Sequence, residues 1–182
     1  MDPIILMQSK WGATYNIPLY LFLGGVSGGI LMVAAVAELI GGGTPKSHAL
    51  SGLSALPVLP FMVVGGVILT IHLGKPERGM FFPFYMKNYD SWLTIGGWII
   101  GLMVPVSLAV AAAWYRPTRR VWRVILAIIS LPLGVLMCLY TGYLLSATQF
   151  VPLWADRYLP MLFLLSGLST GLAVCGINAY VV

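Results

Sequence analysis

The sequence predicts an all-α integral membrane protein with about five transmembrane helices, and three observations carry that prediction. Hydrophobic residues make up 59% of the 182 residues, and the mean hydropathy is +0.94. Charged residues make up only 8%, about a third of the roughly 25% usual in soluble domains. Five apolar stretches follow one another, each longer than the roughly 20 residues that cross the hydrocarbon core. A membrane β-barrel would show short alternating segments instead.

The predicted organisation is one domain over residues 1–182. Its spans cover about residues 18–40, 50–73, 92–114, 122–145 and 159–181. We expect the first four to form a four-helix bundle to which the fifth is added. Asp2 and Pro3 stand where a secretory signal needs a basic cluster, so no cleaved signal is expected. Because Val182 follows the fifth span without a polar tail, we expect a further membrane chain to cover that end.

The first two spans carry their own packing signals. Glycines cluster within residues 24–29 of span one, where they allow another helix backbone to approach closely. The segment 41–46 is expected to be a turn that ends this span. Pro57 and Pro60 are expected to kink span two, and the backbone carbonyls they free need partners in neighbouring helices.

The two cysteines lie in the fourth and fifth spans. Cys138 is near one end of its span, and Cys175 lies much deeper from the same side. Their depths differ by roughly 13 Å at 1.5 Å per residue, which is too far for a disulfide. Two cysteines cannot hold an iron–sulfur cluster, which needs four ligands. We therefore expect both to be packing residues.

The loops define two membrane faces, and we call the face at the N-terminus side A. Lysines and arginines are equally numerous on both sides, with Lys10, Lys75, Arg78, Lys87 and Arg157 on side A and Lys46, Arg116, Arg119, Arg120 and Arg123 on side B. Those on side B lie in short loops without acidic neighbours, as is typical of cytoplasmic loops that meet anionic headgroups. We therefore predict that side B is cytoplasmic. In a membrane protein, the net charge of +5 is relevant to the orientation in the membrane and does not indicate nucleic-acid binding.

Polar side chains within the spans gather on side A. They are Tyr15 and Asn16 before span one, His72 at the end of span two, Asp90 and Ser91 before span three, and Tyr140 and Tyr143 near the end of span four. Tyr140, Tyr143 and Ser146 are spaced by three, so we expect them to share a helix face. Polar groups inside a bundle are costly unless they are partnered or functional. This pattern predicts a binding site at side A.

The available side chains exclude several cofactors. His48 and His72 are 24 residues apart in one span, roughly 36 Å along a helix, so they cannot ligate one haem. No cluster of cysteine, histidine or carboxylate residues has metal-ligand spacing. A quinone needs hydrogen-bond donors for its carbonyls and an apolar slot for its tail. Tyrosine, asparagine and histidine are suitable donors, and side A supplies them.

Several motifs resemble those of one protein family. The run His72-Leu73-Gly74-Lys75-Pro76-Glu77-Arg78 resembles the Leu-Gly-Lys-Pro-Glu-Arg motif of the polysulfide reductase membrane-subunit (NrfD-like) family. Asp90-Ser91-Trp92 and Gly96-Gly97-Trp98 are similar to the start of its third helix. The runs 140–146, 152–154 and 165–171 are similar to its fourth and fifth helices. The order and spacing agree along nearly the whole chain.

The resemblance implies a haem-free, metal-free anchor subunit that oxidises or reduces menaquinone or ubiquinone in a prokaryotic cytoplasmic membrane. Its implied partners are a ferredoxin-like iron–sulfur subunit and, behind it, a molybdopterin or multihaem catalytic subunit. Tyr140 matches the family's pocket tyrosine, and Asn16 falls near its polar pocket residues. The chain departs from the family in having five predicted spans instead of eight or more. It also has Val151 where some relatives carry an arginine.

The expected quinone site therefore contains Tyr140, Asn16, His72, Asp90 and Tyr143. Tyr140 and Asn16 would hold the carbonyls, while His72 or Asp90 exchanges protons with solvent. Simpler roles remain open for four of them: a tyrosine of the interfacial aromatic belt for Tyr140, and helix caps for Asn16, His72 and Asp90.

Three charges of the side A loop, Lys75, Glu77 and Arg78, are expected to dock the iron–sulfur partner. An alternative is that they form an ion-pair network within the loop. Glu38, near the side B end of span one, could begin a proton path, but an interfacial carboxylate in contact with water is the simpler interpretation.

The rival function is a non-catalytic anchor or assembly subunit, with the quinone site on another chain. The small number of spans favours it, and a neighbouring gene for a full-length homologue would support it. A small-solute transporter is a weaker alternative, because the chain lacks paired broken helices at matching positions of two repeats.

Overall fold

The computed structural model describes residues 16–72, 92–116, 118–147 and 156–181. Its helices are α2 (Asn16–Ile40), α3 (Pro45–Ala55), α4 (Val58–His72), α7 (Trp92–Tyr115), α8 (Arg120–Ser146) and α9 (Leu159–Val181). Within these ranges five segments are long and apolar enough to cross a membrane, with α3 and most of α4 together making the second. The predicted class, an all-α multi-pass membrane protein, is confirmed.

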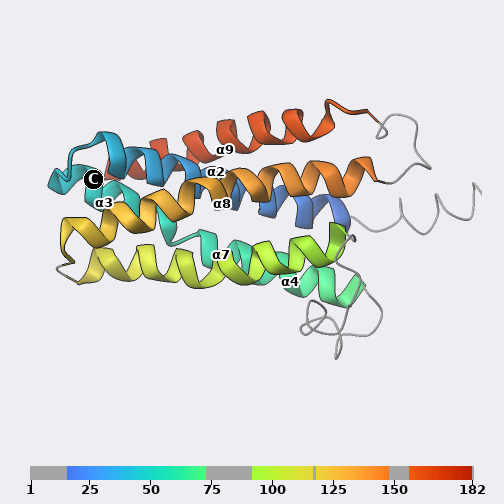
Figure 1. Ribbon diagram of the computed structural model, residues 1–182, viewed down its shortest axis with the longest axis horizontal. Coiled ribbons are helices and arrows are strands. Elements are labelled where there is room, and N and C mark those ends of the chain that lie inside the picture. The colour runs from blue at the N-terminus through green and yellow to red at the C-terminus, as the bar shows by residue number, and fades with distance from the viewer. Residues whose placement is uncertain (1–15, 73–91, 117, 148–155, 182) are drawn as a thin grey trace, which may run out of the picture.

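The long helices lie side by side, with α2 and α8 in the middle of the bundle (Figure 1). Helix α2 packs against α3, α4, α8 and α9, while α7 packs against α8, α3 and α4. The last span, α9, lies on the opposite side of the α2–α8 pair from α7 (Figure 1). Helix α2 is therefore the element around which the described part of the chain is assembled.

Close contacts at glycines hold the central helices together. A Cβ atom on Gly28 would lie 2.7 Å from the backbone oxygen of Gly134 and 2.9 Å from the Cys138 sulfur, both on α8. A Cβ atom on Gly29 would overlap the backbone of Gly167 on α9. The expectation that these glycines serve close helix packing is confirmed. Such contacts matter in a bilayer because helices associate there through close packing and hydrogen bonds, without a hydrophobic driving force.

Both thiols are free and buried. The Cys138 thiol donates a hydrogen bond to the Gly25 backbone oxygen, with sulfur and oxygen 3.4 Å apart. This bond adds a polar link between α8 and α2 at the same seam as the glycines.

The second span is broken into two helices, and it begins earlier than the sequence predicted. Helix α3 ends at Ala55, a turn follows at residues 56–57, and α4 begins at Val58. This agrees with the kink expected at Pro57. The predicted start near residue 50 was wrong, because the Thr44 side chain accepts a hydrogen bond from the Ser47 backbone and caps a helix that begins at Pro45.

Candidate functional site

Two tyrosines meet inside the bundle near side A. The hydroxyl oxygens of Tyr20 on α2 and Tyr140 on α8 are 3.0 Å apart, within hydrogen-bonding distance. The side chains are only 3% and 2% exposed. Tyr140 is therefore not a tyrosine of the interfacial aromatic belt, which was the simpler interpretation of this residue. We call these two residues the tyrosine pair.

Helix α7 closes over the tyrosine pair at a glycine. A Cβ atom on Gly96 would overlap the ring and hydroxyl of Tyr140, so only a residue without a side chain fits there. On the other side, the Tyr20 ring lies against α4, where a Cβ atom on Gly65 would be 3.5 Å from the ring. The pair is thus held between α2, α4, α7 and α8.

Within the described ranges, the hydrogen bonding of the tyrosine pair leaves one donor without an acceptor. Each tyrosine hydroxyl carries one hydrogen and can also accept. One of the two hydrogens forms the bond between the hydroxyls, and either oxygen can be the donor. The other hydrogen has no acceptor among the described residues. The pair therefore holds one O–H group that the described residues do not use, while the internal bond links the two rings.

The first residue of α2 lies on the same side of the helix as the tyrosine pair. Asn16 begins α2 and precedes Tyr20 by four residues, the spacing that places two positions on one helix face. That spacing could have identified Tyr20 from the sequence, but Tyr20 was not among the predicted site residues.

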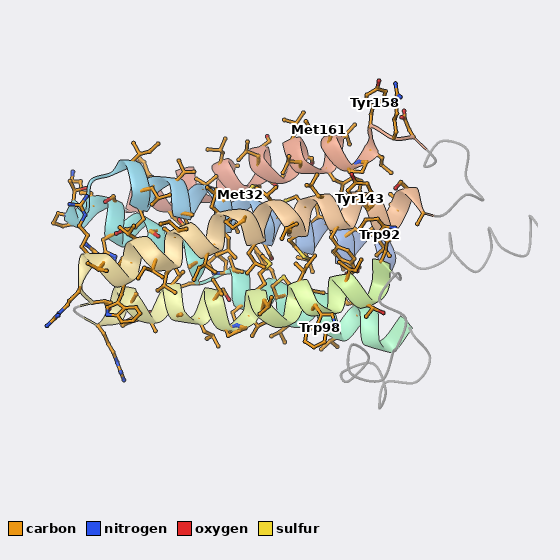
Figure 2. All side chains as sticks on the ribbon, viewed as in Figure 1. Met32, Trp92, Trp98, Tyr143, Tyr158 and Met161 are labelled. Carbon is orange, nitrogen blue, oxygen red and sulfur yellow. The ribbon has the colours of Figure 1, made fainter. Side chains whose placement is uncertain are left out.

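Tyr143 lies one turn beyond Tyr140, and its environment differs. Its ring stacks on Trp92, the first residue of α7, with centroids 4.7 Å apart and an interplanar angle of 5°. Both rings are partly exposed at the side A end of the bundle (Figure 2). Tyr140 and Tyr143 both contact α7, at Gly96 and at Trp92, as expected of two positions on one helix face, but Tyr140 is buried whereas Tyr143 lies at the exposed end of the bundle.

A further buried hydroxyl lies near the start of α7. Thr94 is 1% exposed, and its Oγ1 atom has no hydrogen-bond partner in the described part of the chain. A threonine in a long apolar span is not conspicuous in the sequence, so this residue was missed too.

Several predicted site residues cannot be placed. Asp90, Lys75, Glu77 and Arg78 fall outside the described residues, as do the side chains of Asn16 and His72. The backbone nevertheless puts Asn16 at the start of α2 and His72 at the end of α4, both at side A. Their roles remain predictions.

An apolar groove lies between α2, α8 and α9. It has a volume of about 380 Å³, and its lining includes Phe22, Leu145, Phe163, Ser166 and Thr170. This is within the size range of small-molecule pockets. Neither member of the tyrosine pair lines it, so the groove and the paired hydroxyls are separate features.

The burial of Glu38 differs from what the sequence predicted for side B. This residue was interpreted as an interfacial carboxylate in contact with water, but it is only 4% exposed. Neighbouring helices cover it, and it lies next to Arg123 of α8 and His48 of α3. The covering helices come from distant parts of the chain, which is why the sequence position suggested an exposed end. No group of three histidine, cysteine or carboxylate residues in the described ranges could hold a metal ion.

Comparison with known proteins gives one consistent result. The family model described as polysulphide reductase, NrfD, matches residues 6–182. Protein NrfD of Escherichia coli strain K12 is 29% identical over 184 residues, which cover 88% of this chain and 57% of that protein. A polysulfide reductase chain of Wolinella succinogenes is 28% identical over 204 residues, which cover 92% of the present sequence and 61% of that protein. The chain thus spans about three-fifths of the length of these relatives. No solved structure gives a significant match.

Proposed function

Because the chain belongs to the NrfD polysulphide reductase family, we propose that it is a membrane subunit of a respiratory oxidoreductase that binds a quinone or quinol at side A. The family membership predicted from the sequence motifs is thus confirmed. The finer assignments, to a quinone and to named partners, are our own.

The observation that carries the proposal is the tyrosine pair. Burial and the contact at Gly96 hold the Tyr140 ring in one place, and one hydroxyl hydrogen of the pair has no acceptor in the described part of the chain. A quinone carbonyl is an acceptor that matches this donor, and a donor held ready supports the partial negative charge that develops on oxygen during reduction. We assign the carbonyl contact to Tyr140 with Tyr20 as its positioning partner.

Other side A groups complete the proposed site. Asn16 is a candidate donor for the second carbonyl, since its position lies on the tyrosine face of α2. The stacked rings of Trp92 and Tyr143 offer a flat apolar surface at the membrane boundary, against which a planar headgroup can lie. His72 and Asp90 are candidates for exchanging protons with solvent at the same side.

Electrons would pass between the quinone and a cofactor outside this chain. We propose a ferredoxin-like iron–sulfur subunit docked at side A through Lys75, Glu77 and Arg78, which serves a molybdopterin or multihaem catalytic subunit. Reduction of the quinone takes two electrons from that partner and two protons from solvent, and oxidation of the quinol returns them. The cytoplasmic membrane of a prokaryote is the proposed location, with side B facing the cytoplasm.

The test is a titration of the intact complex, purified through this chain, with a fluorescent quinol analogue. Tyr140→Phe removes the donor and keeps the ring. Loss of one hydrogen bond should weaken binding about threefold to tenfold and lower quinol turnover. Tyr180→Phe is the matched control, because Tyr180 is 95% exposed and lies near the side B end of α9. Quenching that saturates identically in Tyr140→Phe would refute the assignment.

A second candidate function is a non-catalytic anchor. It is favoured by the deep burial of both hydroxyls and by the separation of the apolar groove from them. If the chain is only an anchor, the complex should assemble, but binding to this chain should not quench the fluorescence of the quinol analogue. This should hold for the wild type, for Tyr140→Phe and for Tyr180→Phe.

A further inference from the structure

A second polar cluster lies at side B, near the opposite end of the bundle from Trp92 and Tyr143 (Figures 1 and 2). It joins three helices: Glu38 from α2, His48 from α3 and Arg123 from α8. The Glu38 Oε1 atom is 3.3 Å from Arg123 Nε, and its Oε2 atom is 3.9 Å from His48 Nδ1. None of the residues proposed for the quinone site takes part, so this cluster is independent of the proposed function.

The carboxylate is buried without hydrogen bonds. Neither oxygen of Glu38, nor Nε of Arg123, has a hydrogen-bond partner among the described residues. The two charges are close, yet the N–H group and the oxygen are not aligned for a bond. A buried ion pair offsets its loss of hydration only when the remaining polar atoms are also hydrogen-bonded. Without a further hydrogen-bonding partner, this ion pair therefore does not offset the loss of hydration of its two charges.

A small cavity of about 20 Å³ adjoins the carboxylate. Its polar lining consists of Glu38, His48, Arg123, Ser51 and Ser130. A buried water needs at least about 10–15 Å³ and two to four polar partners. The cavity meets both conditions, and it is too small for most other ligands. Because Glu38 Oε2 and His48 Nδ1 are 3.9 Å apart, they are too far apart for a direct hydrogen bond, and a water in the cavity can bridge them.

The charges favour a neutral occupant. Glu38 and Arg123 carry opposite charges, so together they offer no net charge to attract a cation or an anion. A neutral molecule that both donates and accepts hydrogen bonds satisfies all the polar groups at once. We propose that the cavity is a hydrated proton-binding site, in which an ordered water links Glu38 to His48 and the carboxylate takes up a proton from side B.

The difference in solvent exposure between His48 and Glu38 indicates the order in which they receive a proton. The His48 side chain is 21% exposed, whereas that of Glu38 is only 3% exposed. A proton from the solvent reaches the imidazole first and passes through the water to the carboxylate. One O–H bond forms on Glu38 as one N–H bond breaks on the imidazolium, and solvent at side B then reprotonates His48. Among the described residues, helix α7 contributes Val110 and Ala113 to the lining, and the charged or titratable lining groups are Glu38, His48 and Arg123.

Infrared difference spectroscopy of the reconstituted complex, between alkaline and mildly acidic buffer, tests the site. We expect a carboxylic acid C=O band that shifts in D₂O and is absent from Glu38→Gln. Lys46→Gln, an exposed change on α3, should keep the band. If no band over the pH range of the folded complex is removed by Glu38→Gln, the carboxyl group does not change its protonation state and the proposal is overturned.

His48→Gln provides a second measurement that does not require the Glu38 variant to fold. The Glu38 band should persist in His48→Gln, but its exchange from H to D after mixing with D₂O should slow by about 100-fold, the lower end of what a positioned proton-transfer group contributes. Exchange at the wild-type rate would overturn the relay through His48.

Discussion

The contact between α2 and α8 at Gly28 makes a quantitative prediction about how the bundle is held together. In Gly28→Ala the new Cβ atom would lie 2.7 Å from the Gly134 backbone oxygen. That is about 0.7 Å short of the 3.4 Å at which ordinary contact begins. The carbonyl belongs to a helix backbone and cannot rotate away, so the two helices must move apart.

The size of the effect follows from two opposing terms. Overpacking in a well-packed interior costs about 1–3 kcal/mol. Replacing glycine by alanine within a helix gains about 0.8–1 kcal/mol from backbone propensity. Gly25→Ala isolates the second term, because a Cβ atom there has open space within 4 Å. We therefore expect Gly28→Ala to be about 1–3 kcal/mol less stable than Gly25→Ala.

The assay is unfolding by sodium dodecyl sulfate in mixed micelles, followed by circular dichroism and by tryptophan fluorescence. The two alanine variants are compared under identical conditions, so that the bilayer mimic and the unfolded reference are shared. Equal stability of the two variants would mean that α2 and α8 do not approach each other closely at Gly28. The described packing of these two helices would then be refuted.

The remaining predictions concern the tyrosine pair. A double-mutant cycle with Tyr20→Phe and Tyr140→Phe should give a coupling free energy of about 0.6 kcal/mol and no more than about 1.7 kcal/mol. This is the range measured for hydrogen bonds between membrane helices. Zero coupling in the same unfolding assay would contradict the hydroxyl–hydroxyl bond. Gly96→Ala should displace the Tyr140 ring and weaken quinol-analogue binding at least as much as Tyr140→Phe does. The control is Gly101→Ala on the same helix, where a Cβ atom has open space; this variant should bind the quinol analogue as the wild type does. If Gly96→Ala and Gly101→Ala give the same titration, the proposed site is contradicted.

Much of the fold could be predicted from local features. A span is recognisable because every stretch that crosses the hydrocarbon core must be apolar over about 20 residues, whatever its neighbours are. The break in span two was likewise predictable, because Pro57 itself removes a backbone donor and obstructs the preceding turn. The start at Pro45 was also a local signal, Thr44 followed by proline, which was interpreted as part of a turn.

The candidate site could be located only in part. The polar residues at the ends of spans indicated side A, and Tyr140 came from its match to a family motif. Its partner Tyr20 is 120 residues away, and the sequence offered only its spacing from Asn16. The different burial of Tyr140 and Tyr143 also depends on the helices packed around them, which no spacing within α8 reveals.

By itself, the sequence determined that the protein crosses the membrane about five times, where those crossings lie, and which family it belongs to, because hydrophobic length and motif order are properties of the chain alone. The tertiary structure decided which polar groups face one another: Tyr20 with Tyr140, and Glu38 with Arg123 and His48. The physical reason is that pairing depends on the rotation and depth of one helix against another. Close contacts such as those of Gly28 and Gly29 set both, and they exist only once the helices have packed.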